Sequence, residues 1–143
     1  MVKENTIEKE KIIREIKNYF MDYDNIIAVY LFGSFNTERF NENSDIDLAL
    51  IFSSDIDKLE AFDLKLKVAV GLEEKLNLEF DIVNFDEADL SLKHQIIKGK
   101  LLKGKDNKLR VRKESRTRRE YLDNKYFRET YQKNLGKGFK DGW

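Results

Sequence analysis

The sequence predicts an α+β fold, in which helices flank a small mixed β-sheet and a further helix closes the chain at its C-terminus. Three short apolar runs, at residues 26–32, 46–52 and 80–85, have the β-branched and aromatic composition of strands. Before and between them lie longer segments in which apolar residues recur at helical spacing. Alternating helices and strands of this kind are typical of one domain built around a central sheet.

Residues 7–20 form the first predicted helix. Its apolar residues recur every three or four positions: Ile12, Ile13, Ile16 and Phe20. Asp24 and Asn25 interrupt this pattern before the run 26–32, which ends at Gly33. We expect this run to be a buried strand, because turn signals bound it on both sides.

The middle of the chain contains the next four predicted elements. Residues 36–43 are polar and are expected to form a short helix followed by a loop, and residues 46–52 form the second strand. A helix is predicted over residues 57–76, and residues 80–85 form the third strand. The apolar face predicted for this helix consists of Leu59, Phe62, Leu66, Ala69 or Val70, and Leu76.

The character of the chain changes at Lys98. Between Lys98 and Arg119 there are eleven lysines or arginines and only two acids. Beyond this stretch, a closing helix with an aromatic face is predicted from Tyr121, Leu122, Tyr126, Phe127, Tyr131 and Leu135. We expect that helix to end at Gly136 and Gly138, since glycine readily adopts the left-handed conformation at a helix C-terminus.

The composition excludes several classes of site. The chain has no cysteines, so disulfides and thiolate zinc sites are impossible, and its single histidine, His94, disfavours a histidine-rich metal centre. No apolar run approaches the ~20 residues of a membrane-spanning helix. The charged start of the chain does not match a signal peptide, so we expect a cytoplasmic protein. With 27 basic and 27 acidic residues, net charge indicates no particular partner.

A motif with a chemical meaning lies between the first two strands. Gly33 and Ser34 follow the first apolar run, ten residues intervene, and Asp45-Ile46-Asp47 opens the second run. Side chains two apart in a strand share a face, so the two aspartates would project together. Mg²⁺ prefers such oxygen ligands and usually shares its shell with substrate phosphates. Asp81, in the third run, could supply another carboxylate.

Gly33 and Ser34 are suited to bind a triphosphate on the side opposite the metal. Glycine lets a phosphate approach the backbone closely, and the amides of a helix start and the serine hydroxyl can donate to its oxygens. Taken singly, a Gly-Ser pair is usually an ordinary turn, and an Asp-x-Asp pair can cap a turn or pair with a lysine. The joint occurrence of these parts on suitable elements favours a nucleotide site.

These parts resemble the Gly-Ser, ten residues, Asp-x-Asp motif of the DNA polymerase β-type nucleotidyltransferase superfamily. The short chain resembles its minimal branch, and the segment 118–123 with Tyr126 resembles the tail of the MntA-type antitoxins, which are encoded beside HEPN-domain toxins. The resemblance covers nearly the whole chain. It implies one minimal nucleotidyltransferase domain over residues 1–143, with a catalytic core at 1–97 and a basic segment and C-terminal helix at 98–143.

The resemblance also implies an activity. Members of this family use ATP and Mg²⁺ to attach AMP to a tyrosine of the partner HEPN ribonuclease toxin, which silences it. Asp45, Asp47 and Asp81 would be the catalytic residues and would hold the metal, as two Mg²⁺ ions in the family pattern; Asp81 would also help to activate the tyrosine hydroxyl. Gly33 and Ser34 would hold the β- and γ-phosphates. The implied partners are ATP and the toxin, in a hetero-oligomer; neither nucleic acid nor a membrane is expected.

The stretch after Ser34 departs from the family pattern. Phe35 stands where relatives often have arginine, and Glu38 stands where they often have glycine; Arg39 is the nearby residue that could compensate. Two alternatives therefore stay open. One is a non-catalytic antitoxin that acts by binding alone. The other is a nucleotidyltransferase acting on a small hydroxylated molecule such as an aminoglycoside, which usually needs an additional substrate domain.

Several features have both a structural and a functional interpretation. The basic stretch from Lys98 to Arg119 is a solvated helix face, a surface for a protein partner or, less readily in a neutral chain, a nucleic-acid contact. His94 is interpreted as a surface or capping residue. The aromatic residues of the closing helix most simply pack against the sheet, with an exposed toxin-binding edge as the alternative. Trp143 is either frayed or a docking anchor.

Overall fold

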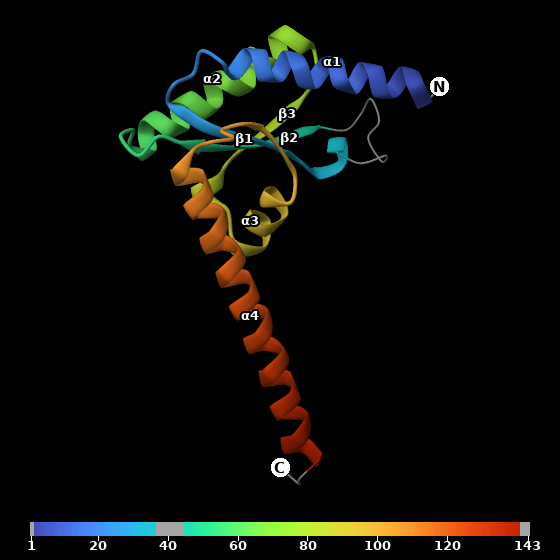
Figure 1. Ribbon diagram of the computed structural model, residues 1–143, viewed down its shortest axis with the longest axis vertical. Coiled ribbons are helices and arrows are strands. Elements are labelled where there is room, and N and C mark those ends of the chain that lie inside the picture. The colour runs from blue at the N-terminus through green and yellow to red at the C-terminus, as the bar shows by residue number, and fades with distance from the viewer. Residues whose placement is uncertain (1, 37–44, 141–143) are drawn as a thin grey trace.

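The computed structural model describes residues 2–36 and 45–140, and the side chains of 8–35 and 45–134. The helices are α1 (Val2–Phe20), α2 (Lys58–Leu76), α3 (Leu90–Ile97) and α4 (Lys108–Lys140). The strands are β1 (Ile26–Phe32), β2 (Ile46–Phe52), β3 (Phe80–Asn84) and β4 (Lys100–Lys103). Short 3₁₀ turns, η1 (Gly33–Asn36) and η2 (Phe85–Glu87), follow β1 and β3. Figure 1 shows the helices around the sheet, with α4 extending far beyond it.

The sheet has four strands in the order β3-β2-β1-β4. The β2–β3 pair is parallel, whereas β1 is antiparallel to both β2 and β4. The predicted α+β fold with a mixed sheet is therefore confirmed. The first two strands have their predicted bounds, and β3 ends one residue early because Phe85 opens a 3₁₀ turn whose first amides are capped by the Asn84 side chain.

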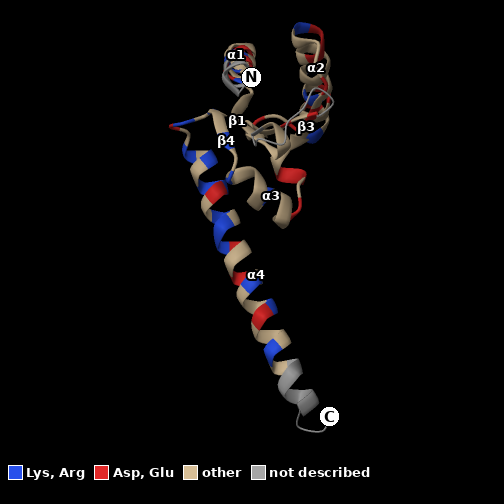
Figure 2. Ribbon diagram, turned by 90° about the vertical axis from the view of Figure 1, so that its right-hand side faces the viewer, with Lys and Arg blue, Asp and Glu red and all other residues tan. Residues whose placement is uncertain are grey.

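Both faces of the sheet are covered, which explains why β1 and β2 are apolar almost throughout. Helices α1 and α2 cover the face that carries Val29 and Leu31. Helix α3 and the beginning of α4 cover the opposite face, which carries Ala28 and Tyr30. Figure 2 shows these two layers on either side of the strands. Two separate apolar clusters, one on each face, form the core.

Helix α3 and strand β4 were not anticipated in the sequence, because each is short and β4 lies in the basic stretch. Leu101 pairs with Tyr30 of β1, and Leu102 is buried in the cluster beneath α1 and α2. The Lys103 ammonium donates to the carbonyl oxygens of Phe20 and Tyr23, at 2.9 and 2.7 Å. At least this part of the basic stretch therefore belongs to the folded sheet rather than to a solvated helix face.

The apolar face predicted for α2 is wrong. The side chains buried beneath this helix are Ala61, Val68 and Leu72. The predicted face is largely exposed: Leu59 70%, Phe62 51%, Leu66 50% and Val70 55%. Ala69 and Leu76 of that set do pack partly against the core. The helix itself has the predicted extent, with Asp57 capping its start and Asn77, at φ 54°, ending it.

Helix α4 also differs from its prediction. It starts at Lys108 and continues through Gly136 and Gly138 to Lys140, so the glycines do not end it. Its distal aromatic and leucine side chains do not pack against the sheet and are exposed: Leu122 63%, Tyr126 73%, Phe127 68% and Tyr131 58%. The reason is the length of the helix, 33 residues, which carries these positions beyond the domain (Figure 1).

The first turns of α4 are attached to the sheet by a buried carboxylate. Glu114 accepts a hydrogen bond from the Tyr30 hydroxyl of β1 and pairs with Arg110 and Arg118 of its own helix. Arg110 also donates to the carbonyl oxygens of Gly104 and Lys105. This network satisfies the buried charge and determines the direction in which α4 leaves the domain.

Some predictions fall where the structure gives no description. The predicted helix and loop at 36–43 lie almost wholly there; only the 3₁₀ turn ending at Asn36 is described. Glu38, Arg39 and Trp143 also lie outside the described residues. None of the helices in the described part of the chain has the length and apolarity to cross a membrane.

Candidate functional site

The residues of the predicted nucleotide site meet at one end of the sheet. Asp47 lies directly opposite Phe32, the last residue of β1, and also opposite Asp81 of β3. Gly33 follows Phe32 at once, and Asp45 precedes β2 by one residue. The strand register therefore brings Gly33, Asp47 and Asp81 together, although 48 positions separate the first and the last in the sequence (81 − 33).

Gly33 is required at its position for two reasons. Its φ of +77° is in the left-handed region, which glycine adopts without the cost that a side chain imposes. A Cβ atom there would also overlap the carboxylate of Asp47. The Asp47 carboxylate thus lies directly against the backbone of the turn that begins with Gly33 and Ser34, as a shared phosphate-and-metal site needs.

The carboxylates repel one another. Burial, the charges of Asp81 and Asp45, and a hydrogen bond shared with Asp81 raise the pKa of Asp47 to about 6. Near neutral pH the ionised site is therefore under electrostatic strain, which a bound cation would relieve. This is the observation by which the site fits a divalent metal.

A fourth carboxylate, Glu79, was overlooked in the sequence. Its side chain is fully exposed, and a hydrogen bond with Asp45 and the charge of Asp45 raise its pKa. The signal was present, because Glu79-Phe80-Asp81 repeats the spacing of Asp45-Ile46-Asp47. In the parallel pairing of β2 and β3, Ile46 lies opposite Phe80, so the two carboxylate pairs lie side by side.

The protein side chains alone do not form a closed metal cage. Within residues 2–36 and 45–140, no group of three or more His, Cys, Asp or Glu side chains has the arrangement of a complete cation site. Magnesium sites in phosphate-transferring enzymes are commonly completed by substrate phosphates around one or two carboxylates. The arrangement of Asp47 and Asp81 agrees with that kind of open site.

Phe35 has a structural explanation. It is buried in the core beneath α1 and α2, and the Lys9 ammonium lies 5.5 Å from its ring centroid. Phe35, at the position where the sequence resemblance led us to expect arginine, therefore anchors the turn after β1 in the core. Ser34, next to it in the same turn, is half-buried.

The beginning of β4 borders the site. Lys100 pairs with Leu31 in β1, and Gly99 lies so close to the Leu31 carbonyl and Phe32 that a Cβ atom would collide with them. Lys98 and Lys100 are both exposed at this edge. The pairing therefore places two basic residues beside the strand that leads into Gly33, a juxtaposition that sequence spacing does not reveal.

His94 has a packing role. Its ring stacks on Tyr121, with ring centroids 3.5 Å apart and planes at 4°, and this contact joins α3 to α4. Burial and the nearby charges of Lys98, Arg118 and Lys125 lower the pKa of His94. A neutral imidazole stacked between two helices agrees with its interpretation as a structural residue.

Comparison with known proteins places this arrangement in a family. The family described as polymerase beta, nucleotidyltransferase, matches residues 14–108, which include Asp45, Asp47, Glu79 and Asp81. The protein adenylyltransferase MntA of Shewanella oneidensis is 28% identical over 99 residues, which cover 68% of this chain and 66% of that protein. The chain thus spans just under two thirds of the length of this curated relative.

Solved structures share the fold. A toxin–antitoxin structure with AMP-PNP has a TM-score of 0.63 and 23% identity, and the match covers 88% of this chain and 97% of that chain. A complex of tri-AMPylated Shewanella oneidensis HEPN toxin with MNT antitoxin has a TM-score of 0.55 and 22% identity, covering 94% and 98%. These matches extend beyond the sheet into the long C-terminal helix.

Proposed function

The chain belongs to the polymerase β nucleotidyltransferase family, and on this premise we propose that it is an antitoxin that transfers AMP from ATP to a tyrosine of a partner HEPN ribonuclease toxin. The observation that carries the proposal is the meeting of Asp47 and Asp81 against the turn at Gly33. Since the reaction consumes ATP, we place the protein in the cytoplasm.

The substrate class comes from the relatives. The curated relative is named a protein adenylyltransferase, and a structure with the same fold holds an AMPylated HEPN toxin with its antitoxin. Another contains AMP-PNP, an ATP analogue. These names support a protein substrate and an adenine nucleotide for this chain as well.

Asp45, Asp47 and Asp81 would hold magnesium, as two ions, together with the phosphates of ATP. Bound there, the metal would stabilise charge on the attacking and leaving oxygens of an in-line displacement. The raised pKa of Asp47, which is due first to burial and then to the charges of Asp81 and Asp45, supports this assignment. Glu79, which contacts Asp45, would hold that side chain in position.

The remaining residues have roles in binding and proton transfer. The backbone amides after Gly33 and the Ser34 hydroxyl would donate to the β- and γ-phosphates. The tyrosine oxygen forms a bond to the α-phosphorus while the bond to the β-phosphate oxygen breaks, so pyrophosphate leaves. Asp81 would accept the phenolic proton and pass it to water, because the hydroxyl is a weak nucleophile until deprotonated.

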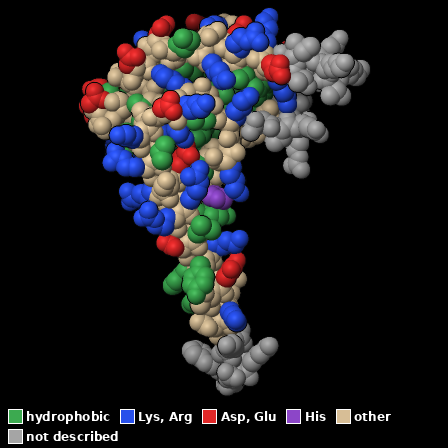
Figure 3. Space-filling view, viewed as in Figure 1, with side chains coloured by type: hydrophobic (Ala, Val, Ile, Leu, Met, Phe, Trp, Pro, Cys, Tyr) green, Lys and Arg blue, Asp and Glu red, His purple; other side chains and the backbone are tan. Residues whose placement is uncertain are grey.

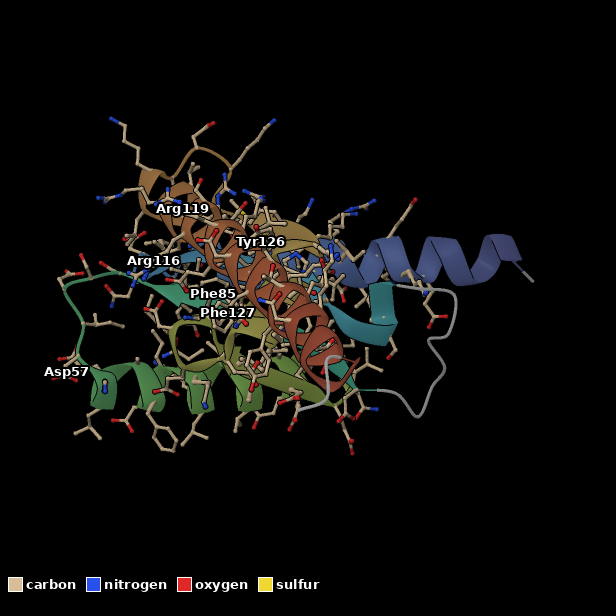
Figure 4. All side chains as sticks on the ribbon, turned by 90° about the horizontal axis from the view of Figure 1, so that it is seen from below. Asp57, Phe85, Arg116, Arg119, Tyr126 and Phe127 are labelled. Atoms are coloured by element: carbon tan, nitrogen blue, oxygen red, sulfur yellow. The ribbon has the colours of Figure 1, made fainter. Side chains whose placement is uncertain are left out.

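A second candidate function is inhibition by binding alone. It is favoured by the distal part of α4, where Leu122, Tyr126, Phe127 and Tyr131 are exposed. Figure 3 shows hydrophobic side chains on the projecting helix, and Figure 4 labels Tyr126 and Phe127 among them. Exposed aromatic side chains on a projecting helix are typical of a protein-binding surface. We assign this segment to the toxin in either case, so binding and catalysis use different parts of the chain.

The alternative of a small hydroxylated substrate has less support, because the relatives named above are a protein adenylyltransferase and a complex with an AMPylated protein toxin. Two hollows of the protein lie away from the carboxylates: one between α1 and α2, and another at the far end of β2 and β3, beside Ser53 and Asn84.

The test is intact-protein mass spectrometry of the toxin encoded beside this protein, after incubation with this chain, ATP and Mg²⁺. We expect the toxin to gain mass in AMP-sized steps, and the Asp45→Asn/Asp47→Asn variant to add none while still forming the complex. Toxin neutralised in cells by that variant, without added mass, would refute catalysis and leave the binding function.

A matched variant separates the two parts of the proposal. Leu122→Lys/Phe127→Lys changes only exposed positions on α4, so the domain should remain folded. We expect this variant to lose the toxin complex in pull-down assays and to modify the toxin slowly. A variant that binds the toxin as well as the parent chain would show that the toxin docks elsewhere.

A further inference from the structure

Helix α2 has a second apolar side that faces away from the protein. Leu59, Phe62, Leu66 and Val70, called here the outer stripe, follow one another at spacings of three, four and four residues. The intervals from Leu59 to Phe62 and from Phe62 to Leu66 match the alternation of three and four residues along the seam between two paired helices, and Val70 extends the stripe by one further turn. The buried side of α2, formed by Ala61, Val68 and Leu72, already provides its contact with the core. The outer stripe is therefore unnecessary for folding of the single chain.

A groove continues the outer stripe toward α1. It has a volume of about 450 Å³, and its walls are Leu66, Lys67, Val70, Gly71 and Glu74 of α2 and Tyr19 and Tyr23 from the end of α1 and the turn after it. The floor beside Gly71 is apolar, and the charged side chains lie at the rim of the outer stripe. The absence of a side chain at Gly71 leaves room for the Tyr19 hydroxyl, which lies directly over it. The side chains of Leu59 and Phe62, in the N-terminal half of the outer stripe, thus lie outside the groove. Those of Leu66 and Val70, in its C-terminal half, line the groove.

We propose that a second copy of this chain covers the outer stripe, with the two α2 helices antiparallel about a two-fold axis near Leu66. Each copy then places its projecting Leu59 against the hollow beside Val70 and Gly71 of the other. Phe62 of each copy packs over the turn of the other helix that contains Ala69. A two-fold axis makes every contact occur twice, as a self-complementary surface requires.

The charges along the helix select the antiparallel arrangement. Asp63 and Lys67 flank the outer stripe on one side, one on each side of the axis, so each aspartate lies opposite the lysine of the second copy. At the ends, Lys58 lies near Glu73 of the second copy, whose carboxylate also accepts a hydrogen bond from the Phe80 amide of its own chain at 3.5 Å. In a parallel pair Glu73, which lies along the line of the outer stripe, would face its own equivalent, and like charges directly opposed are unfavourable.

The arrangement leaves the rest of the protein accessible. Alternation along β2 puts Asp47 on the face of Ala49 and Ile51, which α3 and α4 cover, whereas α2 lies on the other face. Two copies can therefore associate while both carboxylate sites and both distal α4 segments stay open. Because the contact rests mainly on one helix of 19 residues per copy, we expect a reversible, concentration-dependent dimer. This inference is independent of the proposed function.

Sedimentation velocity of the isolated full chain over a series of concentrations tests the proposal. We expect a monomer–dimer equilibrium that Leu66→Lys shifts at least tenfold toward monomer, since it places two ammonium groups near the axis. Val111→Lys, at an exposed apolar position of α4, is the matched control and should leave the equilibrium unchanged. Circular dichroism melting of each variant checks that it is folded.

A charge exchange tests the register. Asp63→Lys and Lys67→Asp should each weaken the dimer, and the double variant should restore it, because the pairs re-form with reversed sign. A chain that is monomeric at every concentration would overturn the proposal. So would a dimer that Leu66→Lys leaves intact, or loss of toxin binding by Leu66→Lys without any change in self-association, which would assign the outer stripe to the toxin.

Discussion

The carboxylate end of the sheet and the outer surfaces of the helices differ in how well the sequence predicts the surroundings of each side chain. At the sheet, pairing of β1, β2 and β3 determines which side chains meet, and Asp47 has defined neighbours on both sides. On α2 and α4, apolar side chains at helical spacing lie outside the core. Strand register thus transmits sequence information into a site, whereas helical periodicity alone does not say which side of a helix is buried.

The largest expected effect is on catalysis at the carboxylate end. If the proposed function holds, Asp47→Asn should lower the rate of AMP transfer by about 10³-fold, equivalent to about 4 kcal/mol, because it removes a charge that would hold the metal. Single-turnover transfer of labelled AMP measures this. Asp86→Asn, an exposed carboxylate paired with Lys113 away from the site, is the control and should retain activity. Equal losses in both variants would contradict the assignment.

The two sides of α2 should differ in their contribution to stability. Leu72 is fully buried, so Leu72→Ala should lower the free energy of unfolding by about 3 kcal/mol. Leu66→Ala, on the outer stripe, should change it by less than about 0.5 kcal/mol at concentrations where the chain is monomeric. Urea unfolding followed by circular dichroism gives both values. Similar losses would mean that the outer stripe is packed within the single chain.

Glycines of the two regions should also respond in opposite directions. Gly33→Ala should destabilise the protein by about 2 kcal/mol, because φ is positive and the new Cβ meets the Asp47 carboxylate. Gly136→Ala, within α4, should stabilise the helix by up to about 1 kcal/mol. Thermal melting of each variant distinguishes them. Stabilisation by Gly33→Ala would show that this turn has another backbone conformation.

The smallest expected effect is a pH dependence. A raised folded-state pKa means that protonated Asp47 favours the folded state, so this contribution is full below about pH 4 and is lost as pH rises through about 6. Because the group is partly exposed, we expect only about 1 kcal/mol. The difference in unfolding free energy between the parent chain and Asp47→Asn, measured without metal at pH 4 and 8, isolates it. Added Mg²⁺ should offset the loss at pH 8.

Sequence patterns predicted the parts of the fold in which each residue has one possible environment. The runs 26–32 and 46–52, apart from Asp47, are apolar on both faces, β-branched and short, so a buried strand was the favoured interpretation, and their bounds were correct. Gly33 directly follows β1, Asp45 and Asp47 lie at the start of β2, and Asp81 lies on β3 beside Asp47, which are the positions that the apolar runs predicted.

The failures occurred where a segment has two possible partners. Helix α2 carries two apolar stripes, and only the tertiary fold decides that Val68 is buried and Leu66 exposed. Strand β4 has four residues, two of them lysines, and its strand conformation depends on pairing with β1. Glu79 lies beside Asp45 because of the parallel register of β2 and β3. The sequence predicts this contact only if the two strands are first aligned.

The close approach of Gly33 and Asp47 also bears on how such chains diverge. The two positions share one volume, so a smaller residue at 47 would remove the clash with a side chain at 33, whereas the positive φ would still disfavour that side chain. A descendant that no longer needs the carboxylate site is free to make both changes, and each then makes reversal of the other harder. A chain with a residue other than glycine at the position of Gly33 is therefore expected to lack the carboxylate at the position of Asp47 as well.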